Sequence, residues 1–83
     1  MATKHELQEW VVEALDHHGG RAHLVDVARY IWAHHEAELR ESEDLFYTWQ
    51  YDMRWAAQKL RDRGVLQKMY GTKGDGRWAL SQP

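Results

Sequence analysis

Residues 45–64, with the sequence LFYTWQYDMRWAAQKLRDRG, have the pattern of a long amphipathic helix that ends at a glycine, and they decide the fold that we expect. At about 100° per residue, apolar side chains fall on one side of this helix: Phe46, Trp49, Met53, Ala56, Ala57 and Leu60. An adjoining side is mostly polar: Tyr47, Gln50, Tyr51, Arg54, Gln58 and Arg61. Gly64 stands where a residue in the left-handed conformation commonly ends a helix. We therefore expect a helix over about residues 44–63, with one side packed and the other offered to a partner.

Two further helices are predicted before it, over about residues 4–17 and 24–36. The first follows a T-x-x-E capping box at Thr3 and Glu6, ends at Gly19-Gly20, and carries a buried stripe. That stripe is Leu7, Val11, Ala14 and Leu15. The stripe of the second helix is Leu24, Val27, Ala28 and Ile31. A brief strand, residues 21–23, is expected between the two helices.

The segment 36–44, EAELRESED, is strongly acidic and has no apolar stripe. We interpret it as the end of the second helix, a surface loop and the start of the third helix, with Ser42 as the N-cap.

After Gly64 the apolar period changes from helical to alternating, in VLQKMY and then RWALS, with the glycine-rich GTKGDG between them. This pattern predicts a β-hairpin over about residues 65–80. Leu66, Trp78 and Leu80 are expected to cover the helices.

A chain of 83 residues is too short to stabilise two cores, so we expect one domain over residues 1–83. It has no cysteine, no apolar run near the roughly 20 residues that cross a bilayer, and no leader before Thr3. We therefore expect a cytoplasmic protein that does not associate with membranes.

The charges are divided unequally along the chain. Residues 1–44 carry ten acidic and four basic side chains, whereas residues 45–83 carry three acidic and seven basic ones. The two halves are therefore about −6 and +4, although the whole chain is −2. Such asymmetry indicates an anionic partner on one face, and solvated helix surfaces produce milder versions of it.

Three helices, a short strand between the first two and a terminal hairpin form the α+β arrangement of a winged helix, within the helix-turn-helix class. Several short motifs add a family resemblance: Met53-Arg54-Trp55-Ala56, Leu60, Gly64-Val65-Leu66 and Gly76-Arg77-Trp78-Ala79-Leu80. Through these residues the chain resembles the N-terminal winged-helix domain of Mrr-type restriction endonucleases. The resemblance implies a DNA-targeting role without cleavage, because in that family a separate domain is the nuclease. The acidic loop before residue 45 is longer than a minimal helix-turn-helix turn.

We therefore expect binding to double-stranded DNA, with the third helix reading the major groove. Its candidate reading residues are Gln50, Arg54, Gln58 and Arg61. Tyr47 and Tyr51 are expected to touch the DNA backbone. In the hairpin, or wing, the residues expected to contact backbone or minor groove are Lys68, Lys73 and Arg77. The competing interpretation is that these are ordinary solvated side chains.

A second function is a winged-helix module that binds protein, without direct DNA contact. Several aromatic residues have no predicted place in the core: Trp10, Tyr30, Trp32, Trp55 and Tyr70. An exposed aromatic cluster often marks a protein interface. A homodimer built on Trp10 or Trp32 is the assembly that we expect.

No pattern of an enzyme or cofactor site is present: no nucleophile beside a base, and no phosphate-binding loop. We expect no catalysis and no cofactor. The pairs His17-His18 and His34-His35 do not predict a metal site, because adjacent side chains on a helix point about 100° apart. They are expected to be surface histidines that confer some pH sensitivity.

Overall fold

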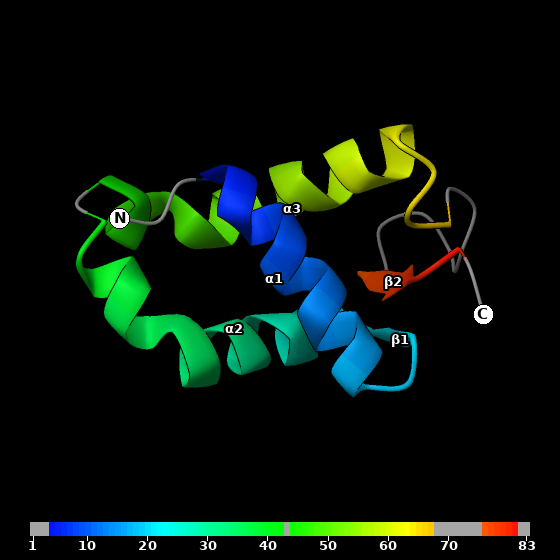
Figure 1. Cartoon of the computed structure of the whole chain (residues 1–83), viewed down its shortest axis with the longest axis horizontal. Helices are drawn as coiled ribbons and strands as arrows, with labels where there is room; N and C mark the ends of the chain where they lie inside the picture. The colour runs from blue at the N-terminus through cyan, green and yellow to red at the C-terminus, as the bar shows by residue number, and fades with distance from the viewer. Residues whose placement is uncertain (1–3, 43, 68–75, 82–83) are drawn as a thin grey trace.

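The computed structural model describes residues 4–42, 44–67 and 76–81, where three helices share a core and a small antiparallel sheet lies at one end (Figure 1). In chain order the elements are α1 (Lys4–His17), β1 (Arg21–His23), α2 (Leu24–Arg40), α3 (Asp44–Asp62) and β2 (Arg77–Ala79). The α+β class predicted from the sequence is confirmed. α1 has the predicted bounds, and α3 ends one residue earlier than predicted.

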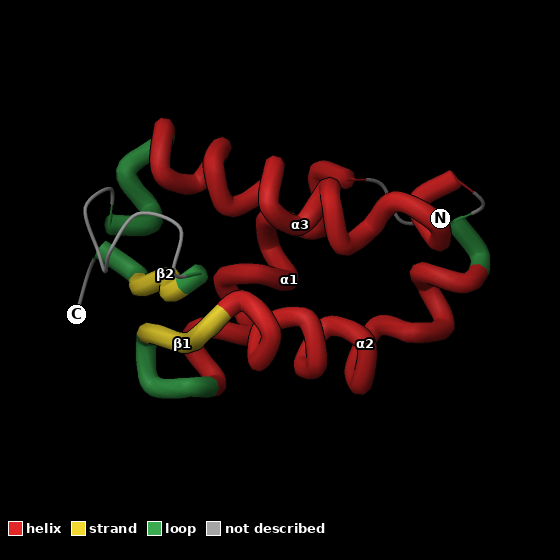
Figure 2. The backbone as a smooth tube through the Cα atoms, turned by 180° about the vertical axis from the view of Figure 1, so that it is seen from behind, coloured by secondary structure: helices red, strands yellow, loops and turns green. Residues whose placement is uncertain are grey.

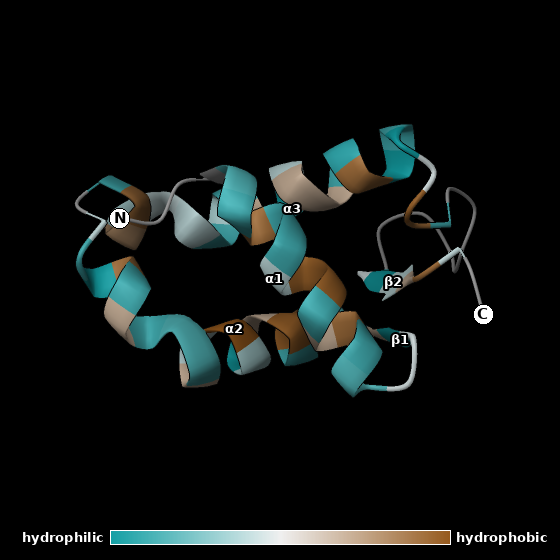
Figure 3. Cartoon of the chain, viewed as in Figure 1, coloured by the Kyte–Doolittle hydropathy of each residue, from teal (hydrophilic) through white to brown (hydrophobic). Residues whose placement is uncertain are grey.

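α1 lies across the other two helices and supplies the middle of the core. Figure 1 shows α1 in front of α2 and α3, and the reverse view in Figure 2 shows those two helices in front of α1. The four residues of its predicted stripe are fully buried: Leu7, Val11, Ala14 and Leu15. Figure 3 shows hydrophilic and hydrophobic residues alternating along α1, as expected for an amphipathic helix. The helical period of the sequence thus orients α1 correctly.

α3 buries its apolar side with one change from the predicted set. Its buried residues are Leu45, Trp49, Met53, Ala56, Ala57 and Leu60. Phe46, which we expected among them, is only partly buried, and Leu45 takes its place. The Phe46 ring instead lies 6.4 Å from that of Trp32 on α2, centroid to centroid.

α2 is longer than predicted, because the acidic segment continues the helix to Arg40 after a kink. The kink is at His35, whose φ of −129° and ψ of 19° are not helical. The second helix was expected to end at about residue 36 and to be followed by a surface loop, but the helix continues to Arg40 and Leu39 is fully buried. Ser42 was expected to cap α3, but its hydroxyl donates to the Glu38 carbonyl at the end of α2. One buried leucine is enough to hold this extra turn against the core.

The sheet joins distant parts of the chain. β1 pairs antiparallel with β2, in the register Arg21↔Ala79, Ala22↔Trp78 and His23↔Arg77. On the other side of this segment Leu66 forms a bridge with Leu80, and the Gln67 amide donates to the Ala79 carbonyl (2.9 Å). These contacts agree with the two arms of the predicted hairpin, while its turn, residues 68–75, lies outside the described residues. Leu66 and Trp78 are buried and Leu80 is partly buried, as predicted.

The junction between β1 and α2 is held by β2. His23 is the N-cap of α2, and its Nδ1 accepts a hydrogen bond from the Val25 amide (3.1 Å). The next amide, of Leu24, donates to the Gly76 carbonyl (2.7 Å). Gly76 has a φ of +77°, and a Cβ there would lie 2.7 Å from Leu24 Cδ2. Only glycine fits this position without a shift of its neighbours.

Candidate nucleic-acid interface

The polar side of α3 is exposed, as the helical period predicted. Gln50, Arg54 and Gln58 are exposed and Arg61 is partly exposed. Four of the seven predicted contact residues therefore share one side of one helix. Tyr47 and Tyr51 lie on the same side and are the most exposed aromatic residues of the described chain, at 84% and 77%.

Hydrogen bonds within α3 divide these residues into two groups. The Gln58 amide donates to Asp62 Oδ1 (3.1 Å), and Arg61 Nη1 donates to Gln58 Oε1 (3.4 Å). Among the described residues, the side chains of Gln50 and Arg54 have no hydrogen-bond or ion-pair partner. A ligand therefore meets free donors at Gln50 and Arg54, whereas it must compete with Asp62 for Gln58.

A groove of about 670 Å³ runs between α2 and α3, and sequence reasoning missed it. Its buried or partly buried lining is apolar and includes Ala28, Trp32, Phe46, Trp49 and Met53. The exposed residues at its mouth include Arg29, Gln50, Tyr51 and Arg54. No residue of α1 lines it, so it opens on the face shown in Figure 2, away from α1.

The aromatic rings of the groove are held by packing between the two helices. Trp32 and Trp49 stack with ring centroids 6.0 Å apart and planes within 10° of parallel. The Arg40 guanidinium lies over Trp32 at 5.3 Å and over Phe46 at 5.6 Å, while its Nε donates to Glu36 Oε2 (2.6 Å). This arrangement keeps Trp32 and Phe46 only partly exposed in the free protein.

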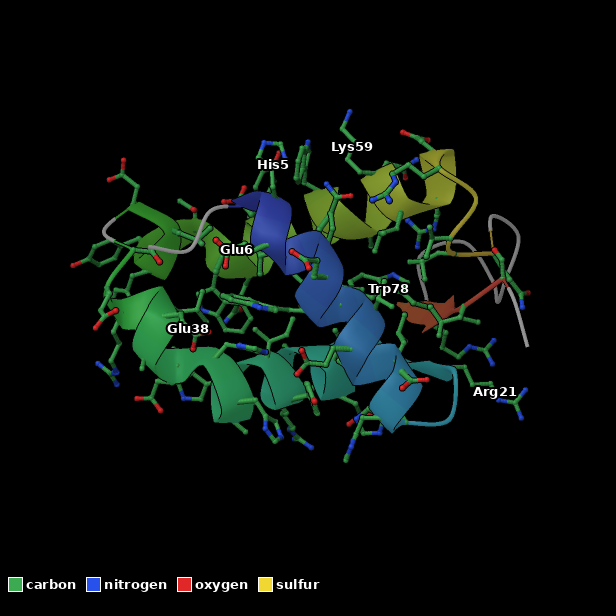
Figure 4. The ribbon with its side chains drawn as sticks, viewed as in Figure 1. His5, Glu6, Arg21, Glu38, Lys59 and Trp78 are labelled. Atoms are coloured by element: carbon green, nitrogen blue, oxygen red, sulfur yellow. The ribbon has the colours of Figure 1, made fainter. Side chains whose placement is uncertain are left out.

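The sheet adds cations that the sequence did not reveal as neighbours. Arg21 of β1 and Arg77 of β2 are both exposed. Paired residues of an antiparallel sheet point to the same side, and alternate residues of a strand do so too. Arg21, His23 and Arg77 therefore share the outer side, while Trp78 points inward; Figure 4 shows Arg21 directed away from the body of the protein. The predicted contacts Lys68 and Lys73 lie outside the described residues.

The charges on α1 differ from those at the mouth of the groove. α1 carries the acidic residues Glu6, Glu9, Glu13 and Asp16. The groove has Arg29 and Arg54 at its mouth and no carboxylate in its lining. Asp26 is nearby, with Oδ1 3.9 Å from Arg29 Nη1, but Arg29 stays 79% exposed. The mouth of the groove is therefore more favourable for an anion than the exposed side of α1.

The tryptophans are less exposed than we expected. Trp10 is buried, with only 6% of its surface exposed, so it cannot serve as an exposed dimer contact. Trp55 is partly buried and meets the His5 ring at 5.7 Å and Lys59 Nζ at 5.8 Å. Tyr70 lies outside the described residues. Of the tyrosines and tryptophans that the structure describes, Tyr47 and Tyr51 are therefore the exposed ones.

A polar cluster links α1 to α2 around His35. His35 Nε2 lies 3.2 Å from Glu13 Oε2, and His35 Nδ1 lies 3.1 Å from Glu38 Oε2. The Tyr30 hydroxyl donates to Glu13 Oε2 (2.8 Å). Burial acts to raise the pKa of Glu13, but the hydrogen bonds from Tyr30 and His35 outweigh it, so this pKa lies below its ordinary value of 4.5. The same bond to Glu13 raises the pKa of Tyr30 above 10.0.

The described part of the chain contains no group of three histidine or acidic side chains placed to hold a metal ion. From the sequence we considered only that the adjacent side chains of His17 and His18 point apart on α1. The fold in addition brings His17 near His34 of α2. The His17 ring lies 6.4 Å from that of His34 on α2, and Tyr30 contacts both rings. Within the described ranges, no helix is long and apolar enough to cross a membrane.

Comparison of the chain with protein-family models, with curated proteins and with solved structures gives no match.

Proposed function

We propose that this protein is a winged-helix DNA-binding protein in which α3 reads the major groove of double-stranded DNA. The order of elements supports this proposal: α1, the strand β1, the pair α2 and α3, and two terminal arms that complete a sheet on β1. The observation that carries it is the pair Gln50 and Arg54, exposed on α3 and free of partners among the described residues.

The chemistry of these two side chains suits base edges. A glutamine amide can donate to and accept from adenine, and an arginine can donate two hydrogen bonds to guanine. Gln50 and Arg54 are one turn apart on α3, so both can face the major groove of the DNA. Gln58 and Arg61 continue this side, with the Asp62 contact as a competitor.

Cations around α3 would position the duplex. Arg77 and Arg21 on the outer side of the sheet and Lys68 and Lys73 in the wing are assigned to phosphate contacts. Such contacts provide most of the affinity and no sequence information. The resemblance to the N-terminal domain of Mrr-type endonucleases supports a DNA-targeting role, with no catalytic group assigned to this chain.

The test is fluorescence anisotropy with a labelled duplex of mixed sequence at low salt. We expect wild-type protein to bind, and Arg54→Ala to bind more weakly. Lys59→Ala is the matched control, because Lys59 lies on α3 but about 140° around the helix from Arg54, beside Trp55. If folded wild-type protein does not bind the duplex at low salt, the proposal fails.

A second candidate is a protein-binding module without DNA contact. The apolar groove between α2 and α3 favours it, because such grooves accept apolar side chains of partner helices. A homodimer through Trp32, which lines this groove, belongs to the same candidate. Light scattering that stays monomeric at high protein concentration would remove the dimer.

A further inference from the structure

An apolar groove lies between α2 and α3, directly beside the residues of α3 that we propose to read DNA. Polar side chains normally meet base edges, whereas this surface is hollowed beside Gln50 and Arg54 and lined with aromatic rings. We propose that the groove binds an unpaired nucleobase, so that the protein prefers DNA containing unpaired nucleotides to a perfect duplex. This inference rests on the proposed DNA-binding function and specifies its substrate.

The size and lining of the groove fit a flat aromatic ligand. Its volume of about 670 Å³ lies within the usual range for small-ligand sites. The most accessible ring is that of Tyr51, which stands at the mouth with 77% of its surface exposed. Trp32 and Phe46 line the groove partly exposed, whereas Trp49 is only 6% exposed and offers little ring surface. Stacking on such rings tolerates any base, because every base has an aromatic face.

The polar groups at the mouth match the rest of a nucleotide. Arg29 lies at the mouth on α2 and Arg54 on α3. With an unpaired base in the groove, Arg54 would contact phosphate beside Arg29, in place of the base edge that we propose it reads in an intact duplex. The Gln50 amide is free to bond the edge of the base. No carboxylate lines the groove, so the site favours an anionic ligand over a neutral or cationic peptide.

Whether a base is paired in the DNA determines how easily it can enter the groove. In a perfect duplex the faces of the bases are covered by stacking, and removing one base from the stack costs free energy. An unpaired or single-stranded base avoids most of this cost. The groove should therefore add affinity for bulged or single-stranded DNA and little for intact duplex.

The experiment compares three labelled DNAs of equal length by anisotropy at low salt: a perfect duplex, the same duplex with a few central unpaired thymines, and one single strand. We expect the bulged duplex to bind about tenfold more tightly than the perfect one. This is the gain in affinity expected from stacking one base on an aromatic side chain. Tyr51→Ala should abolish most of this preference. Tyr47→Ala is the matched control, because Tyr47 is equally exposed one turn away but does not line the groove.

The outcomes separate this inference from the proposed function. Equal binding of perfect and bulged duplexes overturns the inference and leaves duplex reading intact. Binding of only the unpaired DNAs supports the inference and overturns duplex reading. If Tyr51→Ala and Tyr47→Ala weaken the preference equally, the groove is not the site. If folded protein binds none of the three DNAs, both proposals are overturned. A peptide is then the candidate ligand of the groove between α2 and α3.

Discussion

The indole ring of Trp10 on α1 stacks on the imidazole ring of His35 on α2, with centroids 4.2 Å apart and planes 11° from parallel. His35 is the residue at which α2 departs from helical geometry. Its side chain is only 13% exposed and has a carboxylate oxygen near each ring nitrogen. The residue at the kink is therefore packed on one face of the Trp10 ring, and its ring nitrogens contact carboxylates.

Replacement of His35 by alanine should destabilise the protein. His35→Ala removes the stacking with Trp10 and the contacts of its ring nitrogens with the carboxylates of Glu13 and Glu38, which we expect to cost about 1–3 kcal/mol. Urea denaturation measures the free energy of unfolding. His18→Ala is the control, because His18 is exposed and its recorded ring contact is with its neighbour His17. Equal denaturation midpoints for the two variants would contradict a structural role for His35.

Glu13 should contribute to stability only while it is ionised. Its folded pKa is below the ordinary 4.5, so its contribution is present above about pH 4.5 and is lost as the pH falls through the folded pKa. The stability difference between wild type and Glu13→Gln should therefore shrink as the pH is lowered from about 6 to 3. Glu9→Gln, an exposed residue of the same helix, is the control. A difference that grows on acidification would show that the sign is wrong.

Leu60→Ala should be among the most severe substitutions. Leu60 is 2% exposed in the last turn of α3, and loss of a buried leucine side chain costs about 2–5 kcal/mol in such a core. Thermal unfolding followed by circular dichroism is the measurement. Gln58→Ala tests the exposed side of the same helix and should melt close to wild type. A similar melting temperature for Leu60→Ala and wild type would mean that the core is wrongly assigned.

Alanine substitutions at Gly64 and Gly76 should distinguish the cost of backbone strain from the cost of a steric clash. Both have a similar left-handed φ, +77° and +80°, but only a Cβ at Gly76 would meet other atoms within 4 Å. Gly64→Ala should cost about 1–2 kcal/mol from strain alone. Gly76→Ala should cost more, since it also displaces Leu24 and His23 at the start of α2. Equal costs in chemical denaturation would show that the close contact is relieved without penalty.

The salt dependence of DNA binding should report the number of phosphate contacts. If about four of the assigned cations meet phosphates, the slope of log K against log salt should be about −3 to −4. The double variant Arg21→Ala with Arg77→Ala should reduce the slope by up to about 2 and weaken all sequences alike. Arg54→Ala should instead relax discrimination at one base pair. A slope unchanged in the double variant would exclude the sheet from the interface.

The wing makes its own prediction from the sequence. Lys73→Ala combined with Arg77→Ala should also lower the slope by up to about 2, if both contact phosphate. Comparing the double variant with Arg77→Ala alone gives the contribution of Lys73 to the salt-dependence slope. No change between these two variants would remove Lys73 from the DNA-binding residues.

Local patterns in the sequence were sufficient for much of the fold. The buried stripe of α1, the core residues Met53 and Leu60, and the end of α3 near Gly64 follow from helical period and glycine chemistry. These features depend on residues within a few positions of one another, so the chain order contains them directly. The exposed side of α3, with Gln50 and Arg54, follows from the same period.

Tertiary structure alone decided the features that join distant segments. Antiparallel pairing of β1 with β2 brings Arg21 into the sheet of Arg77, although Arg21 lies in the acidic half of the sequence. Packing of α2 against α3 places Arg29 and Arg54 at one groove, and packing of α1 against α2 stacks Trp10 on His35. Hydrophobic period states which side of each helix is buried but not which partner covers it. That choice depends on how the side chains of all three helices fill one core, and it was this packing that created the groove.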